Sequence, residues 1–140
     1  MGRVSFWRIS VRTPAIINGN IVMTWIYRQS DGELMHDDDF IGTGYSGTGF
    51  GRNNPAAQNI QNVGCIPRGR YTIGDSYDDP HLGVCVMHLD PSEDTETFGR
   101  SAFRIHGDNA RNDASHGCVI LGKSIREQIA DSDDQDFEVI

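Results

Sequence analysis

A histidine and a cysteine in the C-terminal part of the chain have the types and the setting that acyl transfer needs. His106 ends the run Phe-Arg-Ile-His, and Cys118 begins a second apolar run directly after Ser-His-Gly. Cysteine reacts as its thiolate, and a free thiol is mostly protonated at neutral pH, so a nearby imidazole is needed as the base. Gly117 lacks a Cβ, so the backbone can turn there and direct the amides of Gly117 and Cys118 at a developing oxyanion. The pattern predicts a cysteine nucleophile with a histidine base.

Two short strands must position this pair. Side chains alternate along a strand, so Ile105 points to one face while Arg104 and His106 point to the other. The segment 107–115 is rich in Gly, Asn, Asp and Ser and has no periodicity, which predicts a loop between two neighbouring strands. We expect folding to bring the thiol and the imidazole together at the lip of an open groove. Arg104 is a candidate for binding a substrate carboxylate, with a solvated arginine as the alternative.

The two residues before Gly117 each have two interpretations. His116 either shapes the oxyanion site and holds substrate, or it is hydrogen-bonded within the loop. Ser115 is expected to bond the loop backbone, with a substrate contact as the alternative. A zinc site made of His106, His116 and Cys118 is the competing prediction, but the spacing is not paired and no fourth ligand is near. A papain-like order is disfavoured because no histidine follows Cys118.

A glycine-rich stretch at 42–51 contains the Gly-x-Gly-x-x-Gly spacing that is also found in dinucleotide-binding sites. The Gly-x-Gly-x-x-Gly spacing begins at Gly42, but such a motif binds phosphate only where a helix follows it. Residues 48–55 are rich in Gly, Asn and Pro and do not favour a helix. We therefore predict a rigid loop that forms a wall of the substrate groove, with Tyr45 and Ser46 as substrate-binding candidates.

Three stretches together resemble a known family. His-Gly at 106–107 followed by Ser-His-Gly-Cys at 115–118 is similar to the signature of the L,D-transpeptidase (YkuD-like) catalytic domain, whose members act on bacterial peptidoglycan. Pro-x-Gly-x-Tyr at 67–71 is similar to the start of a strand in that family. The stretch 40–55 resembles the narrower group of compact L,D-transpeptidase-like toxins delivered by type VI secretion. The resemblance spans about residues 23–121.

The resemblance implies an enzyme that acts on peptidoglycan stem peptides through an acyl-enzyme on Cys118. Water would then give L,D-carboxypeptidase cleavage, and an amine such as a D-amino acid would give L,D-transpeptidase exchange. It further implies that the carbonyl of Gly107 orients His106 and that no cofactor takes part. The chain departs from the family where Ile120 and Leu121 replace an arginine or similar polar residue after Gly-Cys-Val, which leaves the substrate-carboxylate contact unassigned.

The toxin group also implies partners and a location. Such a protein is made in the cytoplasm without a signal peptide, is exported by a type VI apparatus and acts in the periplasm of a target bacterium, while a cognate immunity protein protects the producer. Arg8 and Arg12 interrupt any apolar leader core, in agreement with this expectation. Two alternatives stay open: a non-catalytic peptidoglycan-binding module, and a phage or secreted β-domain that does not contact the wall.

Composition limits the remaining possibilities. With 140 residues the chain is large enough for one domain, and we divide it into an N-terminal extension at 1–22 and a catalytic domain at 23–140. A net charge of −8 argues against a nucleic-acid partner, and no apolar stretch is long enough to span a membrane. The odd count of three cysteines leaves at least one free thiol, and a bridge between Cys65 and Cys85 stays open.

Short apolar runs broken by Gly, Pro and Asp predict a mainly β protein, a β-sandwich of the L,D-transpeptidase catalytic type with one short C-terminal helix. Asp31-Gly32 predicts a hairpin between runs at 24–28 and 33–36. A capping-box pattern beginning at Ser124 predicts a helix to about residue 130. We expect a loop at 75–82 and an edge strand at 137–140.

Overall fold

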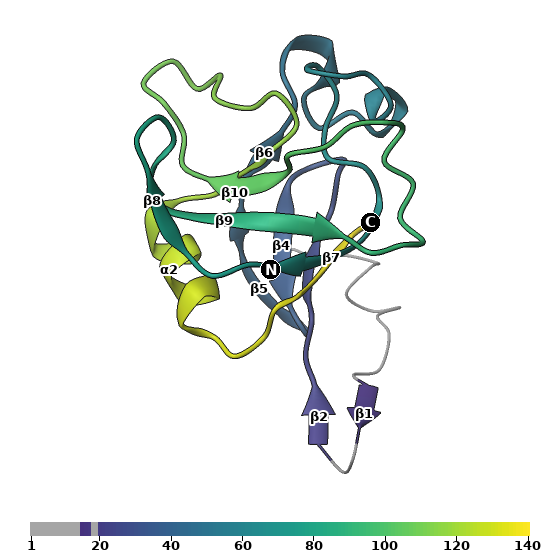
Figure 1. Cartoon of the computed structure of the whole chain (residues 1–140), viewed down its shortest axis with the longest axis vertical. Coiled ribbons are helices and arrows are strands. Elements are labelled where there is room, and N and C mark those ends of the chain that lie inside the picture. The colour runs from purple at the N-terminus through teal and green to yellow at the C-terminus, as the bar shows by residue number, and fades with distance from the viewer. Residues whose placement is uncertain (1–14, 18–19) are drawn as a thin grey trace, which may run out of the picture.

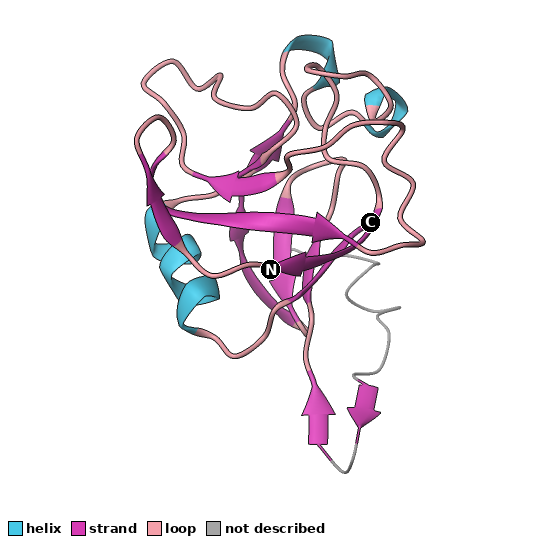
Figure 2. Ribbon diagram, viewed as in Figure 1, coloured by secondary structure: helices cyan, strands magenta, loops and turns pink. Residues whose placement is uncertain are grey.

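A computed structural model describes residues 15–17 and 20–140, with side chains from residue 23 onward. The chain is mainly β with one short α-helix, as predicted (Figure 2). Its elements in chain order are β1 (Ala15–Ile17), β2 (Asn20–Val22), β3 (Trp25–Tyr27), β4 (Glu33–His36), β5 (Asp39–Thr43), β6 (Tyr45–Ser46), the 3-10 turns η1 (Gly49–Gly51) and η2 (Pro55–Ala57), β7 (Gly69–Ile73), β8 (Tyr77–Asp79), β9 (Gly83–Pro91), β10 (Arg104–His106), β11 (Val119–Ile120), α2 (Lys123–Asp131) and β12 (Asp136–Val139).

Ten strands form one hydrogen-bonded sheet in the order β5-β4-β3-β12-β7-β9-β10-β11-β6, with β8 paired to β9. The sheet curls on itself, so that β9 and β10 cross in front of β4 and β5 (Figure 1). Strands from both halves contribute to one apolar core, since Trp25 of β3, Met87 of β9 and Val119 of β11 belong to the same buried cluster. The curled sheet therefore encloses the core much as the predicted sandwich would.

The predicted hairpin between β3 and β4 is confirmed. Asp31 accepts a hydrogen bond from the Glu33 amide, and Gly32 turns the chain with a φ of +73°. A Cβ on Gly32 would lie 1.9 Å from the carbonyl oxygen of Gly44, so both the backbone angle and the close approach of β5 and β6 require glycine. The turn of the hairpin therefore packs closely against the glycine-rich stretch at Gly44.

The C-terminal strand corrects one expectation. We expected an edge strand at 137–140, but β12 lies inside the sheet, parallel to β3 and antiparallel to β7. Phe137 and Val139 are buried on its core face. The apolar side chains of a four-residue strand fit either position, and only partners far away in the sequence decide between them.

Two further expectations were wrong in detail. The segment 75–82 contains the short strand β8, which pairs with β9 in a hairpin rather than forming a loop throughout. Helix α2 begins at Lys123 with Gly122 as its N-cap, and no side chain caps it, so the capping box at Ser124 does not form. The helix is instead held by apolar packing of Ile125 and Ile129 against the core.

Most of the predicted N-terminal extension, residues 1–14 and 18–19, lies outside the described residues. Within the described ones, β1 and β2 form a separate two-stranded sheet beside the main sheet (Figure 1). Cys65, Cys85 and Cys118 are free thiols. Among the described residues, no helix has the length and apolar character that crossing a membrane requires.

The central position of β12 can be tested by truncating its most buried side chain. Phe137 is 0% exposed, so we expect Phe137→Ala to lower the free energy of unfolding by about 3–5 kcal/mol through the loss of buried area and the cavity left behind. Gln135→Ala, an exposed change directly before the strand, should stay within about 0.5 kcal/mol. Urea unfolding would measure both, and equal costs would contradict a central strand.

Candidate active site

The two residues predicted to do the chemistry lie on neighbouring strands. β10 and β11 pair in parallel, with Ile105 opposite Val119 and His106 opposite Ile120. Ile105 and Val119 are fully buried in the core, so alternation directs His106 to the other face. The same register puts Cys118, one residue before β11, on the face of His106. The predicted pairing of the two strands is thus confirmed.

His106 is more enclosed than we expected. Only 3% of the residue is exposed, and β10 lies between β9 and β11 in the sheet. The expectation that both groups lie at an open lip is therefore wrong for the imidazole, while Cys118 is half-buried. His106 Nδ1 lies 2.9 Å from the carbonyl oxygen of Gly107. A carbonyl only accepts, so Nδ1 carries the hydrogen and Nε2 has the free lone pair.

Burial sets the protonation state of both groups. It lowers the pKa of His106, the hydrogen bond to Gly107 raises it, and the charges of Arg126 and Arg104 lower it again. Burial raises the pKa of Cys118, while a hydrogen bond from the Arg104 amide and the charges of Arg104 and Arg100 lower it. The thiol lies 3.9 Å from the carbonyl oxygen of Ala102. The resting site at neutral pH therefore holds a neutral thiol and a neutral imidazole.

A small cavity opens beside the thiol. Its volume is about 150 Å³, and its walls come from the loop before β10, the segment around Gln61 and the residues before β11. His116 is exposed and lines this cavity together with Gly117 and Cys118. His106 does not line it. Any acyl group that enters therefore meets the thiol first, with the imidazole farther along the same face.

Ser115 fixes the turn that presents the cysteine. It is fully buried, and its hydroxyl donates to the carbonyl oxygen of Cys118 at 2.7 Å while accepting from the amides of Gly47 at 2.8 Å and Gly117 at 3.1 Å. The contacts are those expected for the backbone-bonding interpretation of Ser115. Because the Gly117 amide is directed at Ser115, the Cys118 amide is the remaining candidate of the two predicted oxyanion donors.

The two predicted substrate contacts in the glycine-rich stretch are buried and bonded within the protein. Tyr45 Oη donates to Asp108 at 2.6 Å and accepts from the Ala114 amide at 2.9 Å. Ser46 Oγ accepts from the Ile66 amide at 2.8 Å and lies 3.3 Å from the Gly117 carbonyl oxygen. Both residues therefore support the loop 107–117 in this structure, and their contact with substrate stays a prediction.

Arg104 is turned toward the β8–β9 hairpin. Its Nε donates to Tyr77 Oη at 3.0 Å, and the Tyr77 ring stacks on His88 at a centroid distance of 5.1 Å. The amide of Arg104 reaches the Cys118 sulfur, so the residue contributes to the site through its backbone and its charge. Its role in binding a substrate carboxylate stays a prediction.

Sequence reasoning missed Arg100, which lies against the cysteine turn. The residue is 6% exposed, and its guanidinium donates to the carbonyl oxygens of Gln58, Cys65 at 2.8 Å and Gly64 at 3.0 Å. Burial lowers the pKa of Arg100, and the nearby thiols raise it. Backbone carbonyls carry no side-chain signature, so nothing in the sequence pointed to this contact.

The structure argues against a dinucleotide site and a zinc site. After the Gly-x-Gly-x-x-Gly motif the chain forms the 3-10 turn η1 and no α-helix, so the motif is not a dinucleotide site. Within the residues that the structure describes, no three His, Cys, Asp or Glu side chains gather as a metal-binding group. The zinc alternative with His106, His116 and Cys118 is therefore not supported by their placement.

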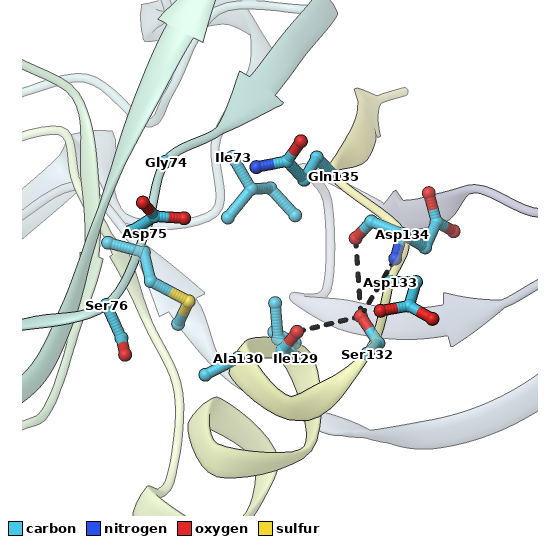
Figure 3. Close-up of a pocket in the computed structure, with 11 residues that line it drawn as sticks. Ile73, Gly74, Asp75, Ser76, Ile129, Ala130, Ser132, Asp133, Asp134 and Gln135 are labelled. Carbon is cyan, nitrogen blue, oxygen red and sulfur yellow. Dashed lines mark hydrogen bonds between the residues drawn. The ribbon is translucent and has the colours of Figure 1, made fainter.

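A second hollow lies away from these residues, between the end of β7 and the end of α2 (Figure 3). Its volume is about 360 Å³, and Asp75, Asp133 and Asp134 make it acidic. The Ser132 hydroxyl donates to the carbonyl oxygen of Ile129 at 2.7 Å and accepts from the Asp134 amide at 3.3 Å, which closes the end of the helix. No cysteine or histidine and none of the predicted site residues line this hollow.

The fold and the site define a mainly β domain with a thiol and an imidazole on one face of two parallel strands. The sequence matches the family model of the Tlde1 domain over residues 41–136, and the chain belongs to this family. The family comprises type VI secretion effectors of the L,D-transpeptidase-like kind, which confirms the predicted resemblance to the compact toxin group. No curated protein matches the chain.

Glycine at position 117 is required for two reasons that can be separated. Its φ is +131°, and a Cβ there would lie 2.4 Å from Arg100 Nη2. Gly99 has a φ of +75° with no atom within 4 Å of its Cβ position, so Gly99→Ala adds backbone strain alone. We expect Gly117→Ala to lower the free energy of unfolding by about 1–3 kcal/mol, more than Gly99→Ala does. Thermal unfolding would measure both, and equal losses would exclude the contact with Arg100.

Proposed function

We propose that this effector domain cleaves or exchanges the terminal residue of peptidoglycan stem peptides through an acyl-enzyme on Cys118. The observation that carries the proposal is the parallel β10–β11 register, which puts the thiol and His106 on one face, with Nδ1 anchored by Gly107. The family supplies the class of protein, a type VI effector of the L,D-transpeptidase-like kind. The substrate and the residue roles are our inference.

The chemistry follows from the neutral pair. Nε2 of His106 takes the thiol proton as the sulfur attacks the carbonyl carbon between a diaminopimelate L-centre and a terminal D-alanine. The tetrahedral oxyanion is held by the Cys118 amide, and its collapse forms the thioester while the imidazolium returns the proton to the leaving amine. Before attack the thiol must leave the Ala102 carbonyl and turn toward Nε2.

The second half of the reaction sets the product. Water that reaches the thioester gives the carboxylic acid, which is L,D-carboxypeptidase cleavage. An amine such as a D-amino acid or a second stem gives a new amide, which is L,D-transpeptidase exchange. In both cases His106 takes a proton from the attacking group and returns it to the sulfur, so the enzyme is regenerated without a cofactor.

The proposal also fixes a place of action. As a type VI effector the protein depends on the secretion apparatus, and a toxin of this kind needs a cognate immunity protein in the producing cell. Stem peptides of the wall lie in the periplasm, so we place the reaction in the periplasm of a target bacterium. The immunity protein would then have to bind there as well.

Two observations favour a second candidate, a non-catalytic peptidoglycan-binding module. The raised pKa of Cys118, caused by burial, and the contact of its thiol with the Ala102 carbonyl describe a thiol that is not poised for attack at rest. Such a module would bind the stem peptide with the loop 107–117. The two functions differ in whether the bound peptide loses its terminal residue.

Turnover of purified tetrapeptide muropeptides, followed by mass spectrometry, decides between them. We expect Cys118→Ala to lose about 10³-fold or more of the activity because no nucleophile remains, and His106→Gln to lose about 10²- to 10⁴-fold. Cys85→Ala removes a free thiol elsewhere and should keep the activity. Binding without loss of the terminal residue, in the wild type as in Cys118→Ala, would establish the module instead.

The pH profile tests the charge environment of the pair. The charge of Arg104 lowers the pKa of both Cys118 and His106, so Arg104→Gln should raise both. The neutral base then exists only at higher pH, so the acidic limb of the kcat/KM profile moves up, and thiol alkylation by iodoacetamide needs higher pH as well. Arg111→Gln, an exposed change in the loop that follows β10, should move neither curve. Unchanged profiles for Arg104→Gln would contradict the role of this charge.

A further inference from the structure

A third cavity adjoins the face that carries His106, and its walls are basic. The cavity has a volume of about 480 Å³ and is lined by Arg52, Lys123 and Arg126, with Ile120 among its apolar residues. Ile120 lies opposite His106 in the β10–β11 pair. The cavity therefore begins on the same face as the proposed catalytic pair, at a residue two positions after Cys118.

Arg126 is a buried cation without a carboxylate partner. It is 7% exposed, its Nε donates to the Leu121 carbonyl oxygen at 3.0 Å, and its Nη1 donates to the carbonyls of Val84 and Cys85. Among the described residues, no carboxylate comes within ion-pair distance of its guanidinium. Leaving a charge buried without a counter-ion is costly, so a bound anion in the cavity would be strongly favoured.

Two further cations line the same cavity. The Arg52 guanidinium lies 3.6 Å above the Tyr45 ring and donates to the Asn112 carbonyl oxygen at 2.9 Å, so it is held in place without using a carboxylate. Lys123 is exposed at the start of α2, where no side chain caps the helix and the amides of the first turn lack intrahelical partners. Arg52, Lys123 and the first-turn amides of α2 therefore add hydrogen-bond donors to those of Arg126.

One carboxylate does line the cavity, and it is already engaged. Asp108 Oδ1 accepts from Tyr45 Oη at 2.6 Å and from the Asn109 amide at 2.8 Å. Three cations against one occupied carboxylate leave the cavity positive, although the whole chain carries a net charge of −8. A local excess of this sign in an acidic protein selects an anionic ligand.

We infer that the Arg52–Lys123–Arg126 cavity is a subsite for a free carboxylate of the peptide whose carbonyl reacts at Cys118. The inference rests on the proposed function, since it assigns the substrate of the same face. The arginines suit a planar carboxylate, which they bind through paired N–H groups. The cavity also supplies the charge that Ile120 and Leu121 do not provide.

Binding to the full-length Cys118→Ala protein tests the subsite without depending on turnover. Two ligands are compared by calorimetry: a tetrapeptide muropeptide with free carboxylates, and the same muropeptide with its carboxylates converted to carboxamides. We expect the carboxamide to bind about tenfold or more weakly, because charge-assisted hydrogen bonds are lost. Adding Arg52→Gln and Lys123→Gln should reduce this ratio to about threefold or less, while Arg111→Gln, an exposed arginine outside the cavity, should leave it unchanged.

The outcomes separate the two proposals. Equal affinity for acid and carboxamide, full discrimination after Arg52→Gln and Lys123→Gln, or binding of neither ligand would overturn the subsite, whatever the wild type turns over. Discrimination that disappears with those two changes supports it, even if the wild type proves inactive. Because Arg126 also holds the start of α2, the test relies on the two less buried cations, whose replacement leaves that anchor in place.

Discussion

The parallel pairing of β10 with β11 is the contact on which the site depends. Each strand is very short, two or three residues, yet the pair decides which side chains face away from the core. A shift of one residue would send Cys118 into the interior and bring Val119 to the reacting face. The register is held by the burial of Ile105 and Val119 and by the Ser115 hydroxyl, which ties the turn before β11 to Gly47.

Two buried arginines complete the surroundings of this pair. Arg100 lies against the cysteine turn and Arg126 beside Gly107, and both are held by backbone carbonyl oxygens rather than carboxylates. Carbonyl dipoles compensate part of the cost of burying each charge while leaving the charge itself in place. The face of the proposed catalytic pair is thus positive on both sides, which attracts anions. Burial is the main cause of the lowered pKa of His106, and the charge of Arg126 lowers it further.

The parts of the fold that were predictable are those with local signals. Asp31-Gly32 marks a turn by its own conformational preference, and Ser-His-Gly-Cys marks a site by its residue types. The central place of β12 depends on partners distant in the sequence, and α2 is held by packing of Ile125 and Ile129 against the core, so alternation and a local capping pattern could not reveal either. Arg100 and Arg126 escaped because any residue can offer a carbonyl oxygen, and only the folded backbone determines which ones converge.

The place of β12 has a consequence for assembly. Residues 137–139 pair with residues 25–27, and the Ile140 amide donates to the Tyr27 carbonyl oxygen at 2.9 Å, so one of the first strands of the main sheet waits for one of the last. The chain must lose the conformational entropy of closing a loop of that length before the contacts between β3 and β12 can stabilise it. During synthesis, β3 has only its hairpin partner until residues 136–139 leave the ribosome. The face that carries His106 and Cys118 therefore gains its full support only after β12 has been synthesised.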